Sequence, residues 1–408
     1  MLKRFEISGY KSLQDAEVSF AAFSVIVGRN NVGKSNLFDA LRLLSNLSQI
    51  SAVDAFRPDH HRGDPRESLF SAVNPILRIR CELDLTGNPH PFEKNQVISN
   101  PLLQYEIQLN IQKGIEILKE TLTGKTQDGV RSRPFIHMEG NNTTIVVNRD
   151  GARGGKSRRF NNLVTRSVMT IIDDAELYPH VVALARELSS WRFFHFEPDA
   201  LREPSPAMDI LELESNGRGL SGFYDTLANL EPRRYHYAER ALHRGIPEAK
   251  EIRVLDTGDR RRLLAVVRED GREFTARVLS DGTLRFMALI ALAYAPEPPG
   301  LVCFEEPENG VHPGKLPFIV DTLRGLSQRG EEGGKRSQVL VNSHSPYLVD
   351  LLEPEEIILA TLHPHGRTQF ELVKEDLFTR RPELKQILET GEQTLGELWS
   401  QGGLNENA

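Results

Sequence analysis

A phosphate-binding loop pattern at residues 28–35 constrains the fold of this 408-residue chain more than any other feature. The segment reads G-R-N-N-V-G-K-S and matches G-x-x-x-x-G-K-S, a pattern that is meaningful between a strand and a helix. The apolar run Phe23–Val27 predicts the strand. After the loop, Leu37, Leu41 and Leu44 share one helical face, which predicts a helix packed on a sheet. The chain is therefore expected to contain an α/β domain of the phosphate-loop type.

The residues of this loop have distinct expected roles. Glycines let backbone N–H groups close around phosphates, Lys34 neutralises the β and γ oxygens, and Ser35 offers its hydroxyl to Mg²⁺. We expect the nucleotide to be contacted by Gly28, Asn30, Asn31, Gly33, Lys34, Ser35 and Asn36. A glycine turn that binds no ligand is the alternative interpretation.

Two adjacent carboxylates end an apolar run at residues 300–306. Such a run is typical of a buried parallel strand that presents acids at the carboxyl edge of a sheet. We expect Glu305 to support the Mg²⁺ shell and Glu306 to polarise the attacking water as general base. Taken alone, an apolar strand that ends in two glutamates is equally compatible with a structural role.

Two further segments have the character of phosphate contacts. Ser280 and Gly282 lie at the start of a helix predicted over residues 284–294, where they would form a second anion-binding nest. His344 follows an apolar strand that begins at residue 339, and it is placed to hydrogen-bond a γ-phosphate.

These four elements occur in the order found in ABC-type ATPases: Walker A loop, signature, Walker B strand and switch histidine. Residues 305–313, E-E-P-E-N-G-V-H-P, are similar to the E-E-P-E-x-x-L-H-P element of the RecF/SMC/OLD-like AAA branch. Residues 7–13 are similar to the N-terminal strand of these families, and residues 396–404 resemble a tail of their stand-alone members. The chain departs from the pattern at Glu305, where most relatives carry Asp, and at Asp281 and Thr283 of the signature.

The resemblance implies ATP and Mg²⁺ as ligands and a head-to-tail homodimer. Each ATP would be held by Lys34 and Ser35 of one subunit and by Ser280 and Gly282 of the other. Hydrolysis with Glu306 as base would release the dimer, so that ATP acts as a switch.

The expected fold is α/β: a P-loop NTPase with an ABC-type ATPase head, a mixed sheet and an inserted helical lobe. Residues 1–150 would hold the Walker A loop and antiparallel strands, 151–250 the helical lobe, and 251–408 the signature, Walker B strand and switch histidine. The better strand and helix candidates in the first two segments are 76–85, 103–111, 143–147, 181–191 and 219–242.

Composition limits the classes that remain. The net charge of −7 argues against a surface coated in basic residues, and the basic clusters within 149–166 and 260–262 lack interleaved aromatics, which favours solvated loops. Cys81 and Cys303 are expected to be buried thiols. The absence of a long apolar run predicts a cytoplasmic protein without a membrane segment.

Four further side chains, those of His60, His61, His312 and Lys11, have either a functional or a structural interpretation. His60 and His61 lack carboxylate or cysteine companions at metal spacing, which argues against a metal site. His312 is expected either to face a partner subunit or to cap the next helix, and Lys11 either to approach a phosphate or to lie at the surface.

Three hypotheses concern the output of the ATP cycle. The first is the ATPase subunit of an antiphage or DNA-repair system, acting with a separate effector such as a nuclease and with DNA or RNA as a possible ligand. The second is an OLD-like nuclease, against which stand the 64 residues after His344 and the lack of an Asp-x-Asp pair. The third is a transporter ATPase subunit, which the E-E-P-E element and the altered signature disfavour.

Overall fold

The computed structural model describes residues 1–61, 63–70, 74–86, 98–112, 114–126, 134–139, 144–149, 157–161, 164–328, 337–363 and 365–404. The chain forms two compact units that interleave along the sequence. The first unit comprises Met1–Ala21, Gly28–Trp191 and Ile358–Leu372, and the second comprises Ala22–Val27, Arg192–Ile357 and Val373–Ala408. The division at residues 150 and 250 inferred from the motifs remains a prediction.

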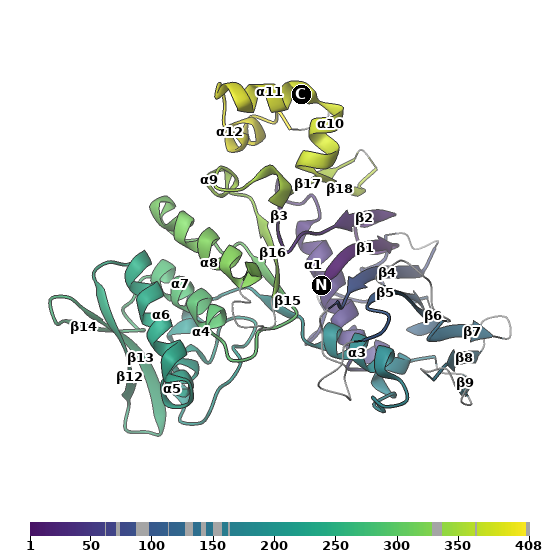
Figure 1. The fold of residues 1–408 in the computed structure, drawn as a ribbon, viewed down its shortest axis with the longest axis horizontal. Helices are drawn as coiled ribbons and strands as arrows, with labels where there is room; N and C mark the ends of the chain where they lie inside the picture. Colours follow the sequence, from purple (N-terminus) through teal and green to yellow (C-terminus); the bar gives the residue numbers. More distant parts are fainter. Residues whose placement is uncertain are drawn as a thin grey trace. The chain divides into compact units, whose positions relative to one another are not determined.

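An antiparallel sheet forms the centre of the first unit (Figure 1), in the order β2-β1-β4-β5-β6-β7-β8-β9. Its strands are β1 (Leu2–Ser8), β2 (Ala16–Ser19), β4 (Ile76–Asp84), β5 (Leu102–Asn110), β6 (Glu116–Lys125), β7 (Ile136–Glu139), β8 (Thr144–Val147) and β9 (Arg158–Asn161). The same unit contains α1 (Lys34–Leu47), α2 (Ala52–Ala55), the 3-10 turn η1 (Val168–Thr170), α3 (Pro179–Ser189) and the hairpin of β17 (Ile357–Leu362) with β18 (Thr368–Leu372).

The strands of this sheet show why β4 and β5 were predictable, whereas β6, β7 and β9 were not predicted. β4 and β5 alternate strictly between buried and less buried residues, and both were predicted from that period of two. β6 was not predicted. A register shift opposite Gln108 and Leu109 interrupts its alternation, as a bulge does.

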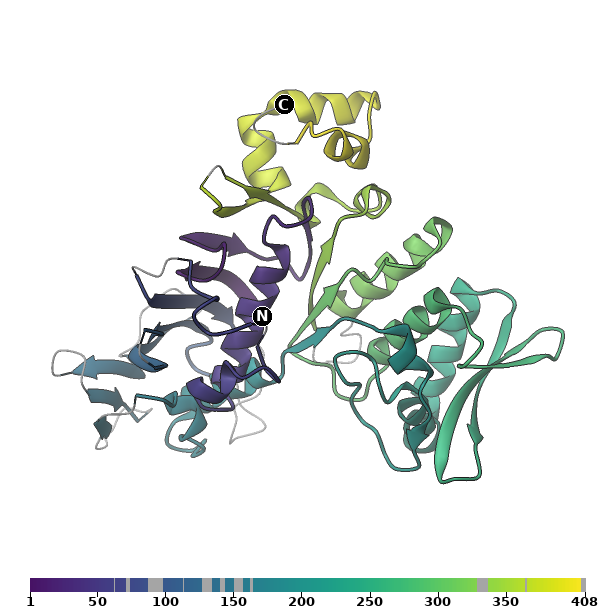
Figure 2. The same ribbon diagram turned by 180° about the vertical axis from the view of Figure 1, so that it is seen from behind.

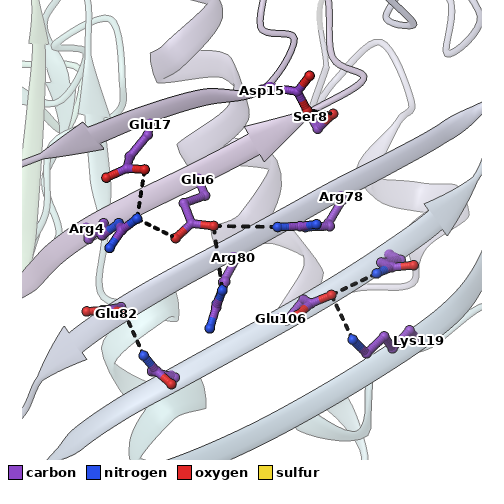
Figure 3. Close-up of polar contacts among 12 residues, drawn as sticks. Arg4, Glu6, Ser8, Asp15, Glu17, Arg78, Arg80, Glu82, Glu106 and Lys119 are labelled. Carbon is purple, nitrogen blue, oxygen red and sulfur yellow. Dashed lines mark hydrogen bonds and ion pairs between the residues drawn. The ribbon is translucent and has the colours of Figure 1, made fainter. Parts of the chain in front are cut away.

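The outer face of this sheet carries a ladder of charges that pair across the strands (Figure 3). Arg4 contacts Glu17 at 2.7 Å and Glu6 at 3.2 Å, and Arg78 reaches Glu6 from the neighbouring strand at 3.5 Å. Because opposite charges lie side by side, this face is largely neutralised by its own residues.

A buried carboxylate on the inner face anchors η1 to the sheet. Glu120 accepts hydrogen bonds from the Tyr105 hydroxyl at 2.9 Å, from the Ser167 hydroxyl at 2.6 Å and from the Val168 N–H at 3.0 Å. Burial raises the pKa of Glu120, and these three donors oppose that effect by stabilising the carboxylate.

The second unit combines a parallel sheet with helices and a smaller antiparallel sheet (Figure 2). Its parallel strands are β10 (Arg192–Phe194), β15 (Leu301–Glu305), β16 (Gln338–Ser343) and β3 (Phe23–Val27), in that order. The antiparallel sheet holds β11 (Ser205–Pro206), β13 (Arg261–Arg268), β12 (Ala249–Asp256) and β14 (Glu273–Thr275). The main helices are α4 (Pro198–Arg202), α5 (Leu220–Leu230), α6 (Pro232–Gly245), α7 (Asp281–Ala293), α8 (Leu316–Gln328), α9 (Pro346–Val349), α10 (Phe378–Arg380), α11 (Pro382–Thr390) and α12 (Leu395–Ser400).

One predicted helix is two helices. The pattern at 219–242 predicted a continuous helix, but α5 ends at Leu230 and α6 begins at Pro232. Proline lacks the N–H that a helix interior requires, and its ring clashes with the carbonyl four residues earlier, so Pro232 starts a new helix.

The two cysteines and the membrane prediction can be compared directly with the structure. Cys81 and Cys303 are free and buried, as expected. Across the described residues, no helix has the length and apolar character needed to cross a membrane.

Replacing Glu120 by Ala is expected to lower the free energy of unfolding by about 2–4 kcal/mol, because three buried donors lose their acceptor. Chemical denaturation of the purified protein measures this loss. Glu116→Ala, at an exposed position of the same strand, is the matched control and should change stability by less than about 0.5 kcal/mol. Equal stability of the two variants would contradict the anchoring role.

Candidate nucleotide-binding site

Three parallel strands bring the predicted motifs to one edge of the sheet. In β3 and β16, Val27 pairs with Ser343, and in β16 and β15, Asn342 pairs with Glu305. Because the strands are parallel and in this register, all three end at the same edge, where α/β proteins bind ligands. The residues that follow these strand ends are Gly28, His344 and Glu306.

The loop after β3 depends on backbone conformations that few residues adopt. Gly33 has φ 103°, and Asn31 has φ 64°. A Cβ atom at Gly33 would lie 2.1 Å from the Thr368 hydroxyl oxygen and 2.5 Å from that of Ser12. Gly33 is therefore required both by its dihedral angle and by the close approach of two side chains.

The Lys34 side chain folds back over the loop. It is 7% exposed, and its Nζ donates to the carbonyl oxygens of Gly28 at 2.7 Å and Arg29 at 2.9 Å. Its ammonium group thus lies on the inner side of the loop, where phosphate oxygens bind in proteins with this pattern.

Side chains far away in sequence support the loop. The Thr368 hydroxyl donates to the Val32 carbonyl at 2.7 Å and lies 2.6 Å from the Ser12 hydroxyl. The Asn36 amide donates to the Ser12 hydroxyl at 2.8 Å, which connects the start of α1 to the same support, and contact of Asn36 with nucleotide remains a prediction. Thr368 was not predicted, because no local pattern links it to a loop more than 300 residues earlier.

Lys11 and His61 both have internal partners. Lys11 forms a 2.6 Å ion pair with Asp39 of α1, so it connects the turn after β1 to that helix. His61 is buried and lies 2.9 Å from the Tyr10 hydroxyl and 3.2 Å from the Ser68 hydroxyl. Burial lowers the pKa of His61, which favours the neutral ring.

The structure brings Glu306 and His344 together. The carboxylate Oε1 of Glu306 lies 3.2 Å from Nδ1 of His344. Glu306 has φ 47°, and its N–H donates to the side-chain and backbone oxygens of Asn342, each at 3.1 Å. Asn342 therefore holds the turn that directs Glu306 toward His344. Glu305, the last residue of β15, is partly buried.

Glu308 belongs to the E-E-P-E element, but the sequence pattern alone predicts no role for it. Glu308 is 7% exposed and accepts a short hydrogen bond from the Ser343 hydroxyl, which also accepts from the Ser345 N–H at 3.1 Å. Within the described residues, its other oxygen has no hydrogen-bond partner. Burial raises the pKa of Glu308. This buried carboxyl therefore connects the turn after β15 to the segment that carries His344.

The signature segment forms the start of α7. The Ser280 hydroxyl caps this helix by accepting from the Thr283 N–H at 3.3 Å. Asp281 pairs with Arg202, which also donates to the Leu279 carbonyl at 3.2 Å. The Thr283 hydroxyl lies 2.9 Å from the Ser280 hydroxyl, so both departures from the family pattern, at residues 281 and 283, have local structural roles.

The start of α7 packs closely on the turn that follows Glu306. A Cβ atom at Gly282 would lie 3.2 Å from the Gly310 carbonyl oxygen. Arg285 lies in the same region, where burial lowers its pKa against the opposing effect of nearby carboxylates. For His312, the capping alternative is confirmed, since its Nδ1 accepts from the Gly314 N–H at 3.1 Å.

Comparisons with known proteins agree with this geometry. Residues 1–133 match the family described as "AAA ATPase domain", and residues 170–350 match the family described as "AAA domain, putative AbiEii toxin, Type IV TA system". No curated protein matches the chain.

The fold resembles that of Smc heads. The Smc head bound to the C-winged helix domain of ScpA gives a TM-score of 0.55 at 14% identity, over 91% of this chain and 96% of its own. The Thermotoga maritima SMC head domain gives 0.45 at 12% identity, over 91% and 98%. The Smc head with an extended coiled coil bound to the C-terminal domain of ScpA, derived from Pyrococcus furiosus, gives 0.48 at 13%, over 95% and 99%.

Two segments of the chain therefore match models of AAA-type ATPase domains, and the fold is similar to that of an Smc head. These findings confirm the resemblance and the α/β fold class, and they are consistent with an ABC-type P-loop ATPase of the RecF/SMC-like branch.

The melting temperature of Glu308→Gln minus that of wild type is expected to be higher at pH 8 than at pH 5. A carboxyl whose pKa is raised by folding stabilises the folded state below its unfolded pKa and loses that stability as pH rises through its folded pKa. Glutamine does not ionise, so the variant does not lose stability in this way as pH rises. Each tenfold change in proton affinity between the folded and unfolded states corresponds to about 1.4 kcal/mol of stability.

Thermal unfolding of both proteins at several pH values between these limits tests the expectation. Glu297→Gln, at an exposed site in the same unit, is the control and should track wild type at each pH. A difference between Glu308→Gln and wild type that stays constant with pH would contradict the assignment.

Proposed function

We propose that this protein binds and hydrolyses ATP with Mg²⁺, and that ATP drives head-to-tail dimerisation of two copies. The observation that carries the proposal is the adjacency of strand ends in β3, β16 and β15, which are followed by the phosphate loop, His344 and Glu306. In phosphate-loop proteins such strand ends present the nucleotide-binding and hydrolytic groups.

The residues of the loop fit a nucleoside triphosphate. The glycine conformation at residue 33 and the inward ammonium of Lys34 suit a phosphate chain, and the hydroxyl of Ser35 with the carboxylate of Glu305 would hold Mg²⁺. Bound Mg²⁺ supplies charge neutralisation at the phosphates. Gly28, Asn30 and Asn31 would contribute to the same loop.

Glu306 would accept the proton of the attacking water. His344, at hydrogen-bond distance from this carboxylate, would hold its orientation and contact the γ-phosphate. Asn342 would act indirectly by fixing the turn at Glu306.

The dimer would place Ser280 and Gly282 of one copy over the ATP of the other. Two findings support this arrangement: the Smc-head fold and the exposed helix start that Ser280 caps. A helix N-terminus with free N–H groups favours an anion.

Such a cycle would regulate a separate effector in the cytoplasm, within a DNA-repair or antiphage system. One similar Smc head is described as bound to a domain of another protein, which supports a protein partner here. The description that matches residues 170–350 names a toxin of a toxin–antitoxin system, which supports a defence role. A nuclease is one effector of this kind.

Lys34→Ala is expected to lower ATP turnover by about 10²-fold or more, because the variant loses the charge that stabilises the β and γ oxygens. Phosphate release from purified protein measures turnover. Lys385→Ala, at an exposed lysine of α11, is the control and should retain wild-type turnover. Near-normal turnover by Lys34→Ala would remove this residue from the site.

Glu306→Gln is expected to bind ATP normally but to turn over about 10²–10⁴-fold more slowly, because the amide cannot accept a proton. The variant should therefore accumulate as an ATP-bound dimer, which light scattering with ATP and Mg²⁺ detects. Adding Ser280→Arg should restore monomers, since a bulky cation would block the opposing copy. A Glu306→Gln protein that stays monomeric at saturating ATP would contradict the proposed dimer.

A further inference from the structure

The helix α6 presents two faces of different chemistry. It packs against α5, α7 and β12 (Figures 1 and 2). On the packed side, the Tyr235 hydroxyl donates to the Ile252 carbonyl at 2.7 Å, and Glu239 accepts from the Ile252 N–H at 3.2 Å. Ala238 and Leu242 are buried on this side. The opposite side is exposed to solvent.

The exposed side carries one row of residues, which we call the α6 stripe: Arg233, Tyr237, Arg240 and Arg244. Their spacing of four, three and four residues places them on a single face of a helix. All four are exposed. The distance from the first arginine to the last is about 16 Å along the helix axis.

The three arginines of the stripe differ from the paired arginines of the same unit. Among the described residues, none of the three forms an ion pair or a side-chain hydrogen bond, whereas Arg262 pairs with Asp225 and Asp256 and Arg324 pairs with Glu356. The remaining arginine of α6, Arg234, contacts Glu231 and the carbonyl of Ala295.

The charge of α6 is opposite to that of the whole chain. The helix has four arginines and one glutamate, and that glutamate faces β12, while the chain has a net charge of −7. The other acidic groups near its ends are Glu231, paired with Arg234, and the exposed Glu248. An uncompensated row of guanidinium groups on an acidic protein favours a negatively charged partner.

An aromatic ring lies in the middle of the stripe. Tyr237 is 50% exposed, and its ring stacks on that of Tyr294 with centroids 6.3 Å apart and an interplanar angle of 29°. The Tyr294 ring therefore supports the Tyr237 ring, half of whose surface remains exposed. Arginines interleaved with an exposed aromatic are typical of surfaces that bind single-stranded nucleic acid, where bases stack on the ring.

We infer that the α6 stripe binds single-stranded nucleic acid. Arg233, Arg240 and Arg244 contact backbone phosphates along one strand, and Tyr237 stacks with a base. For a strand stacked as in B-DNA, with a rise of about 3.4 Å per nucleotide, the length of the stripe corresponds to about five nucleotides. The two basic clusters noted in the sequence lack an interleaved aromatic, and the inference does not depend on them or on the proposed ATPase cycle.

Fluorescence anisotropy of the full chain with labelled oligonucleotides of about 16 nucleotides tests this inference. The three ligands are single-stranded DNA, RNA of the same sequence and the DNA duplex. Comparing the two single strands shows whether the protein prefers DNA or RNA. Wild type should bind at least one single strand more tightly than the duplex, with an affinity that falls steeply as salt rises.

Two variants separate the two parts of the stripe. The double variant Arg240→Gln with Arg244→Gln should weaken single-strand binding at least about tenfold. The slope of the logarithm of the binding constant against the logarithm of the salt concentration should become shallower by about one to two. Tyr237→Ala should weaken single-strand binding about fivefold or more with an unchanged salt dependence, because stacking releases no counterions.

Arg260→Gln with Arg261→Gln is the matched control, since it removes the same charge from exposed positions of the same unit. This variant should bind like wild type. An equal loss in both pairs, no oligonucleotide binding by wild type, tighter duplex binding, or polyglutamate competing as well as an oligonucleotide would each overturn the inference. The stripe variants should retain wild-type ATP turnover, so a failure here is distinguishable from a failure of the ATPase proposal.

Discussion

The parallel pairing of β3, β16 and β15 is the interaction on which the candidate site depends. Its hydrogen-bonded register sets Val27 beside Ser343 and Asn342 beside Glu305, so three separate segments of chain leave the sheet at one edge. A slip of one residue would turn each side chain to the other face of the sheet. The buried polar residues of β16 oppose such a slip, because it would separate Asn342 from the Glu306 N–H to which it is hydrogen-bonded.

The groups that leave this edge are held by contacts from residues distant in sequence. Thr368 and Ser12 fix the phosphate loop, Asn342 fixes the turn at Glu306, and the buried carboxyl of Glu308 connects that turn to Ser343. Each contact involves a partner whose own position is set by a strand or a strand end. Preorganisation of this kind lets a site bind and react without first ordering its own side chains.

Charged groups of this protein fall into those that are paired within the protein and those that remain free to contact a ligand. On the outer face of the first unit's sheet, Arg4, Arg78 and Glu6 neutralise one another across strands, and Glu120 is satisfied by three donors on the inner face. Along the α6 stripe, the arginines have no such partners in the described part of the chain. Since an exposed ion pair contributes little to stability, what distinguishes these surfaces is which charges remain available to a ligand.

The sequence by itself determined the elements whose signals are local. The phosphate loop, the buried strands β3, β15 and β16 and the start of α7 follow from apolar runs, glycine positions and a helix cap within a few residues. Two local signals were misjudged: Pro232 divides a predicted helix, and a bulge conceals β6. Nucleotide contact by Asn36 was also expected locally, and it remains a prediction, while its amide binds Ser12.

Only the tertiary structure decided which distant residues meet. Thr368 at the phosphate loop, Arg202 on Asp281 and Ser343 on Glu308 leave no trace in a local pattern. The exposed row on α6 became meaningful once the structure showed which face of that helix is packed and which arginines lack partners. The physical reason is that hydrophobic periodicity fixes the direction of a side chain from its own element, whereas its partner depends on how elements pack together.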